Sequence, residues 1–122
     1  MKYLKLFESF TEDDLINFKK LQLEQNLRIC KDKNFDISNG KFISLYHGTN
    51  PANFKKILKS NKLKSGTWLA IDYETARRYG NMATKRGEPV VTLCVVNLED
   101  LYYNGYWSTA RDVYFGNGVY SS

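Results

Sequence analysis

The segment that most constrains the fold is VVTLCVV, at residues 90–96, a nearly continuous run of apolar and β-branched side chains. β-Branched residues favour strands, and an uninterrupted apolar run offers no polar face to solvent. We therefore predict that residues 90–96 form a buried central strand. At 122 residues the chain is long enough for one domain, so this strand should belong to a single core.

Capping signals in the sequence predict three helices before this strand. Thr11, with Asp14 three positions later, predicts a helix that runs to about Cys30. Asn50 before a proline predicts a second helix, and Asp72 predicts a third. The apolar face of the first helix is expected at Leu15, Phe18, Leu21 and Leu27, and that of the second at Phe54, Ile57 and Leu58. The third helix should end at Gly80, because glycine commonly terminates helices.

Short strands are predicted at residues 42–46, 67–71, 113–115 and 119–120. With residues 90–96 they give one helix followed by the order β-α-β-α-β-β-β. This order predicts an α+β domain with an N-terminal helix over residues 11–122.

The net charge and the small number of His and Cys residues limit the classes of function that the chain could have. Lys and Arg number 18 against 13 Asp and Glu, a formal net charge of +5. This balance suits an anionic ligand or a nucleic acid, although many enzymes share it. His47 is the single histidine, and Cys30 and Cys94 lie far apart, so we predict no metal site and free buried thiols. No run approaches the roughly 18 apolar residues of a membrane span, so no membrane partner is expected.

The local motif that suggests chemistry is Tyr46-His47-Gly48-Thr49, at the end of a predicted strand. A glycine after a histidine lets a ligand approach the main chain beside an exposed imidazole. Taken alone, the motif fits a structural turn histidine better than a binding residue.

Four ordered segments extend the motif: LYHGT at 45–49, a helix ending in Ile57-Leu58, GTWLA at 66–70 and TARRYG at 75–80. Together they resemble the His-Tyr-Glu branch of the ADP-ribosyltransferase superfamily. There, a His-Gly-Thr/Ser strand precedes a helix, a Gly-x-Tyr-Phe-Ala strand and a Ser/Thr-Ala-x-x-Tyr helix. The resemblance covers about residues 42–98 and implies a small split-sheet domain that takes NAD as a substrate and needs no metal.

The resemblance implies a role for each matching residue. His47 would hydrogen-bond an NAD ribose, the Gly48 main chain would hold the nicotinamide carboxamide, and Tyr79 would stack on the nicotinamide ring. Trp68 stands where the family usually has Tyr, so the aromatic face is kept and the hydroxyl is not. Further contacts are expected from Tyr46, Thr49, Arg77 and Arg78, the arginines toward the pyrophosphate. Core packing of the aromatics and a solvated helix face for the arginines are the simpler alternatives.

The third family motif, a Glu at the start of a late strand, has no direct counterpart. Asp112 precedes the predicted strand at 113–115 and is the first choice for the catalytic acid, and Glu99 is the second. Both could equally be surface charges. Without an acid in the cleft, NAD binding alone would remain.

Residues 1–10 read as a separate leader. Leu6-Phe7-Glu8 resembles the Leu/Ile-x-Glu site cut by the prohead protease of large tailed bacteriophages, whose packaged head proteins begin with short targeting peptides. An ordinary amphipathic N-terminus is the alternative.

The resemblances together predict a phage-encoded mono-ADP-ribosyltransferase. It would be a monomer that modifies a protein or nucleic acid in the host bacterial cytoplasm, packaged in the phage head. The alternatives are a non-catalytic NAD, ADP-ribose or nucleic-acid binding module of the same fold, and a structural or DNA-associated head protein.

Overall fold

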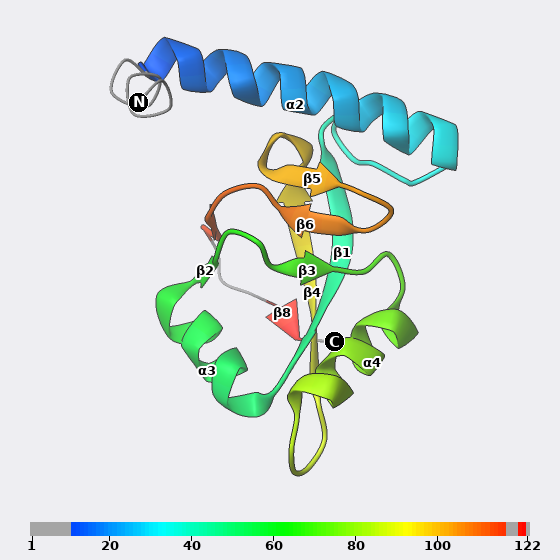
Figure 1. Cartoon of the computed structure of the whole chain (residues 1–122), viewed down its shortest axis with the longest axis vertical. Helices are drawn as coiled ribbons and strands as arrows, with labels where there is room; N and C mark the ends of the chain where they lie inside the picture. Colours follow the sequence, from blue (N-terminus) through cyan, green and yellow to red (C-terminus); the bar gives the residue numbers. More distant parts are fainter. Residues whose placement is uncertain (1–10, 117–119, 122) are drawn as a thin grey trace, which may run out of the picture.

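A computed structural model describes residues 11–116 and 120–121 (Figure 1). The predicted leader at residues 1–10 and the start of the predicted strand at 119–120 lie outside the described residues. The helices are α2 (Glu12–Lys33), α3 (Pro51–Ser60), α4 (Tyr73–Ala83) and the short 3-10 helix η1 (Leu98–Asp100). The strands are β1 (Phe42–Thr49), β2 (Lys62–Leu63), β3 (Trp68–Leu69), β4 (Val90–Asn97), β5 (Leu101–Tyr103), β6 (Trp107–Thr109), β7 (Val113–Tyr114) and β8 (Tyr120–Ser121).

The long strands β1 and β4 pair antiparallel over their whole length, from Phe42 opposite Asn97 to Thr49 opposite Val90. β8 adds to the other edge of β4, so β4 is the middle strand, as its sequence predicts. Burial of β4 on both faces is only partial, because Val95 is 49% exposed while Val96 is buried. The outer face of the sheet is therefore open at that end.

The remaining strands form two more small antiparallel sheets, β3-β6-β5 and β2-β7. Paired backbone hydrogen bonds of 2.8 Å between Tyr46 and Ala70 join β1 to the segment after β3. The core lies between the inner face of β1 and β4 and the β3-β6-β5 sheet. Its most deeply buried side chains include Ile43, Leu45, Leu63, Leu69, Leu98, Leu101 and Trp107. The α+β class with an N-terminal helix is confirmed, whereas the β5–β6 hairpin was not predicted.

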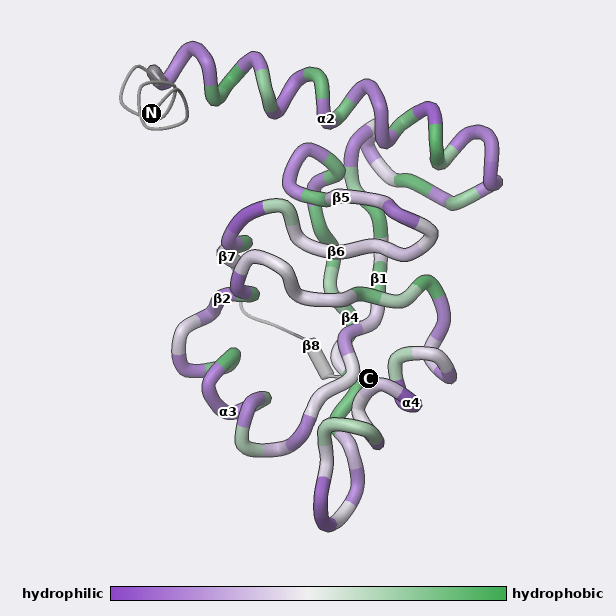
Figure 2. Tube along the Cα trace, in the orientation of Figure 1, coloured by the Kyte–Doolittle hydropathy of each residue, from purple (hydrophilic) through white to green (hydrophobic). Residues whose placement is uncertain are grey.

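The helix α2 begins with the predicted capping box between Thr11 and Asp14. Its predicted apolar face is wrong in the first half, where Phe18 is 56% and Leu21 63% exposed. This half runs past the sheets, and apolar and polar residues alternate along it (Figures 1 and 2). The anchor is instead the fully buried Asn26, whose Nδ2 donates to the carbonyl oxygens of Leu98 and Leu101 at 2.7 and 2.8 Å.

The predicted caps of α3 and α4 are confirmed, with the Asn50 and Asp72 side chains accepting from backbone N–H groups three residues later. Within α3, Leu58 is 49% exposed, so the predicted buried stripe is wrong there. The prediction that α4 ends at Gly80 is also wrong, because the helix continues to Ala83. A Cβ on Gly80 would lie 2.7 Å from the Cβ of Pro89, so this glycine allows close packing and does not end the helix.

Candidate functional site

His47 lies near the end of β1, opposite Thr92, with its ring half-buried. Its Nδ1 lies 3.0 Å from the carbonyl oxygen of Trp68. Burial lowers the pKa of the imidazole, and the Trp68 carbonyl opposes this shift only in part. A carbonyl can only accept, so Nδ1 carries the hydrogen and donates it. The neutral ring therefore keeps Nε2 as an acceptor, suited to a hydroxyl group of a ligand.

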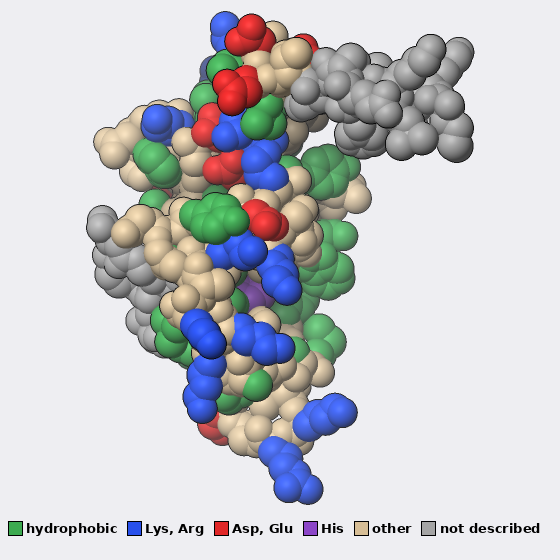
Figure 3. Space-filling view, turned by 90° about the vertical axis from the view of Figure 1, so that its left-hand side faces the viewer, with side chains coloured by type: hydrophobic (Ala, Val, Ile, Leu, Met, Phe, Trp, Pro, Cys, Tyr) green, Lys and Arg blue, Asp and Glu red, His purple; other side chains and the backbone are tan. Residues whose placement is uncertain are grey.

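A cavity of about 330 Å³ opens beside this imidazole, between α3 and the segment around β2. Three lysines line it, Lys56, Lys62 and Lys64, together with the polar residues Asn53 and Ser60. Figure 3 shows the histidine recessed between Lys and Arg side chains. Three lysines along one cavity favour an anionic ligand such as a phosphate.

These lysines were missed from the sequence. The signal was present in KKILKSNKLK at residues 55–64, where five of ten residues are lysine. Such a run normally indicates a solvated face, and only the turn between α3 and β2 directs three of the lysines toward one cavity.

The backbone of Trp68, which contacts His47, also carries one ring of an aromatic cluster, and Trp68 is 51% exposed. The centroid of the Trp68 ring lies 5.7 Å from that of Tyr79 and 5.1 Å from that of Tyr106. The Trp68 and Tyr79 rings meet edge to face, so a planar ligand would lie against an exposed ring face and not between these two rings. The Trp68 backbone thus contacts His47 and the Trp68 ring contacts Tyr79, while His47 and Tyr79 line different cavities.

A second cavity, of about 220 Å³, continues from this cluster. Its lining includes five aromatic residues, Phe35, Tyr79, Tyr103, Tyr106 and Trp107. The Trp107 indole is 1% exposed, and its Nε1 has no hydrogen-bond partner among the described residues. Rings on several sides make this cavity suited to a flat ligand.

The other residues of the Tyr46-His47-Gly48-Thr49 motif have structural partners. The Tyr46 ring packs against the small cluster under α4 and meets Tyr73 edge to face at 5.9 Å. Thr49 is buried, and its hydroxyl accepts from Asn53 Nδ2 at 2.8 Å. A Cβ on Gly48 would lie 1.6 Å from a backbone oxygen of α4, so the helix packing alone requires glycine.

The backbone N–H and C=O of Gly48 nevertheless point to the edge of β1 that does not pair with β4, where a ligand could form hydrogen bonds with them. Tyr46 exchanges its backbone hydrogen bonds with Ala70, on the side of β1 away from β4. Because alternate residues of an antiparallel strand point to the same side, the Gly48 N–H and C=O point toward this edge too.

The two candidate acids differ in position. Asp112 accepts from the Ser65 N–H at 2.8 Å and lies 3.6 Å from Lys62 Nζ, at the border of the lysine-lined cavity. The Ser65 amide first, and then Lys62, hold the pKa of this carboxyl below its usual value. Glu99 follows the far end of β4, about 17 Å along the strand from the level of His47. The structure therefore separates Glu99 from the imidazole.

The two arginines of α4 do not line the lysine-lined cavity. Arg77 pairs with Glu88 at 2.9 Å, and Arg78 donates to Thr75 Oγ1 at 3.4 Å. The lysines are consequently better placed than either arginine to meet an anion beside His47.

Comparison with known proteins gives no relative: no family model matches the chain, and no curated protein matches it significantly. Among residues 11–116 and 120–121, no group of three or more His, Cys, Asp and Glu side chains could hold a metal ion. In the same part of the chain, no helix is long and apolar enough to cross a membrane.

Proposed function

We propose that the protein is an NAD-dependent mono-ADP-ribosyltransferase. The observation that carries this proposal is the position of His47, with one ring nitrogen fixed on Trp68 and the other free beside a lysine-lined cavity. A dinucleotide with a charged centre and flat rings at both ends matches a protein that offers lysines beside His47 and an exposed Trp68 ring. The resemblance of the motifs to the ADP-ribosyltransferase family supports the same substrate and a split-sheet version of the α+β fold.

Each part of NAD has a partner in this proposal. The pyrophosphate lies among Lys56, Lys62 and Lys64, a ribose hydroxyl donates to His47 Nε2, and the nicotinamide lies on the exposed Trp68 ring. The bond between nicotinamide and C1′ of its ribose breaks, the electron pair leaves with nicotinamide, and an acceptor oxygen or nitrogen bonds to C1′. The acceptor loses one proton, so NAD and the acceptor give nicotinamide, the ADP-ribosylated acceptor and H⁺.

Asp112 is the acid we assign to this reaction. Its carboxylate would stabilise the positive charge that develops at C1′ as the bond breaks. Nicotinamide leaves as a neutral molecule, so no strong general acid is required. Phage origin, packaging in the head and action in the host cytoplasm remain proposals, supported by the leader motif and the family resemblance.

The test is release of nicotinamide from NAD in the presence of bacterial lysate, with detection of ADP-ribose on macromolecules. Wild type should release nicotinamide, and His47→Ala should reduce the rate at least about 100-fold, because positioning of the ribose is lost. Joint substitution of Lys56, Lys62 and Lys64 by Gln should raise KM for NAD about tenfold or more. The matched control replaces three lysines of α2, Lys19, Lys20 and Lys31, by Gln. No turnover by wild type, or equal turnover by His47→Ala, contradicts the proposal.

A non-catalytic NAD-binding module is the second candidate, and one specific observation favours it. Asp112 does not line the lysine-lined cavity and is already bonded to Ser65 and Lys62. The acid is thus engaged in holding two loops together. Calorimetry that shows NAD binding, with no nicotinamide released by wild type, would select this candidate.

A further inference from the structure

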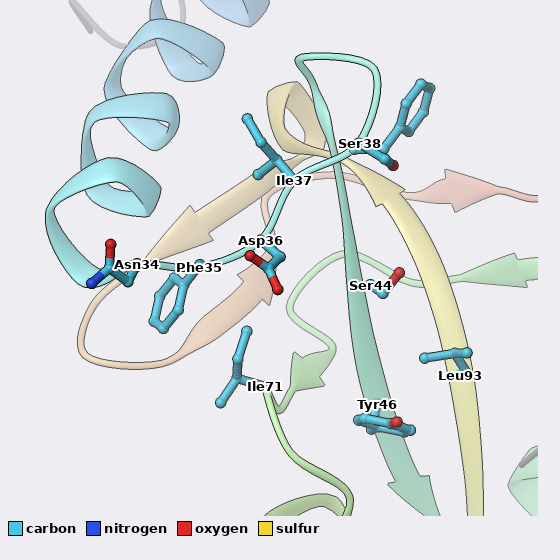
Figure 4. A pocket seen from close by; sticks show the side chains of 10 residues that line it. Asn34, Phe35, Asp36, Ile37, Ser38, Ser44, Tyr46, Ile71 and Leu93 are labelled. Carbon is cyan, nitrogen blue, oxygen red and sulfur yellow. The ribbon is translucent and has the colours of Figure 1, made fainter.

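A third cavity, larger than the two described above, lies on the outer face of β1 and β4 and measures about 490 Å³ (Figure 4). The loop between α2 and β1 forms one wall, and Ser44, Tyr46, Leu93 and Ile71 form the floor and the opposite side. The proposed function makes no use of this cavity. It shares Phe35 and Ile71 with the 220 Å³ cavity that Tyr79, Tyr106 and Trp107 line, so these two cavities are neighbours.

The single charged side chain lining this cavity is Asp36. Figure 4 shows its carboxylate turned from the loop toward the space between Ser44, Tyr46 and Ile71. Asp36 has no hydrogen bond or ion pair with another described residue. Asp112 and Asp100, in contrast, are both paired with basic side chains. A carboxylate left without a partner in a chain of net charge +5 is free to pair with a cation from outside.

Other groups around the cavity add to its preference for a cation. Asn34, another lining residue, is the C-cap of the 22-residue α2, whose C-terminal end carries partial negative charge. The lining also includes the rings of Phe35, Phe42 and Tyr46, and aromatic faces attract cations.

Two native ammonium groups already lie on rings of this region. Lys41 Nζ is 5.4 Å from the centroid of Phe42, and Lys33 Nζ is 5.8 Å from that of Tyr103. Neither lysine lines the cavity, and neither pairs with Asp36. They reduce the attraction for an incoming cation without filling the site.

We infer that this cavity binds a basic side chain of a protein partner, an arginine or a lysine, against the Asp36 carboxylate and the Tyr46 ring. An arginine fits best, because a planar guanidinium can stack on a ring while it donates two hydrogen bonds to one carboxylate. The bound side chain anchors the partner beside the NAD site. This favours a protein over a nucleic acid as the acceptor, a consequence that rests on the proposed function. The negative carboxylate would repel nucleic-acid phosphates.

The test is an NMR titration of the ¹⁵N-labelled full chain with the peptide acetyl-Gly-Arg-Gly-amide, without NAD. Amide shifts should change at Ser38, Ser44 and Ile71, and the peptide with neutral citrulline in place of arginine should not change them. Asp36→Asn should weaken binding about tenfold, because a charge-assisted hydrogen-bonded pair is lost. Asp32→Asn removes the same charge outside the cavity and should leave the affinity unchanged. Lys41→Gln should strengthen binding about twofold, because a nearby repelling charge is removed.

Equal binding of the citrulline and arginine peptides, or shifts confined to other residues, would overturn the inference. A short single-stranded oligonucleotide that shifts the same three amides would also overturn it in favour of a nucleic-acid partner. Unchanged amide shifts elsewhere in Asp36→Asn show that the variant is folded. Because NAD is absent, failure of this titration leaves the proposed function standing, and failure of nicotinamide release leaves the arginine site standing.

Discussion

The close packing of α4 on β1 predicts a large loss of stability from a single methyl group, in Gly48→Ala. The added Cβ would lie 1.6 Å from the carbonyl oxygen of Ala76 and 2.5 Å from its carbonyl carbon. Ordinary contact begins at 3.4 Å, so the oxygen is about 1.8 Å too close. Both partners are backbone atoms, which cannot move aside as a flexible side chain can. Helix α4 would have to shift, which would open the cluster of Ala70, Ala76 and Val91 beneath it.

We expect Gly48→Ala to lower the free energy of unfolding by at least about 3 kcal/mol, at the upper end for overpacked sites. With a urea slope of about 1.5 kcal/mol per molar, the unfolding midpoint should fall by about 2 M. Gly116→Ala is the matched control, because a Cβ there meets no heavy atom of a described residue within 4 Å, and it should change stability by less than about 0.5 kcal/mol. If the two variants unfold at the same urea concentration, α4 is not seated on β1 as described.

Three further predictions concern buried polar groups. Asn26→Ala should lower the free energy of unfolding by about 2 kcal/mol in urea, because two buried hydrogen bonds are lost, while exposed Gln25→Ala should change it little. Burial lowers the His47 pKa in the fold, so the unfolded chain binds the proton first and stability should fall as pH drops below about 6.5. Urea unfolding at about pH 7.5 and about pH 5.5 should show a smaller difference for His47→Gln than for wild type. Burial raises the pKa of the Cys30 thiol, and it raises the pKa of Cys94 to about 12. Iodoacetamide should therefore modify both thiols only after unfolding. Labelling of Cys94 in the native protein would contradict its burial.

Helix starts were predictable from the sequence because a cap depends on residues a few positions apart. Thr11 with Asp14, Asn50 and Asp72 all act as predicted. Which face of a helix is buried depends on what packs against it. Leu21 has the spacing of a core residue, yet it lies on the half of α2 that passes beyond the sheets.

Gly80 also shows the difference between what a local pattern predicts and what tertiary packing decides. Gly80 follows a tyrosine near the expected end of a helix, a local pattern that predicts a C-cap. The reason for glycine at this position is Pro89, which is nine residues away and packs against it. No local rule contains this information, because the contact exists only once the strand β4 has returned alongside β1.

The candidate site divides similarly between local pattern and tertiary contact. The sequence by itself determined the strand with His47 at its end, the aromatic residues Trp68 and Tyr79, and the α+β order of elements, since each depends on nearest neighbours along the chain. Only the tertiary structure decided that lysines of α3 and of the segment around β2 share a cavity with His47, that Arg77 pairs with Glu88, and that Glu99 lies at the far end of the sheet. The sequence does not tell which way a charged surface side chain points. Its direction is set only when packing fixes the backbone that carries it.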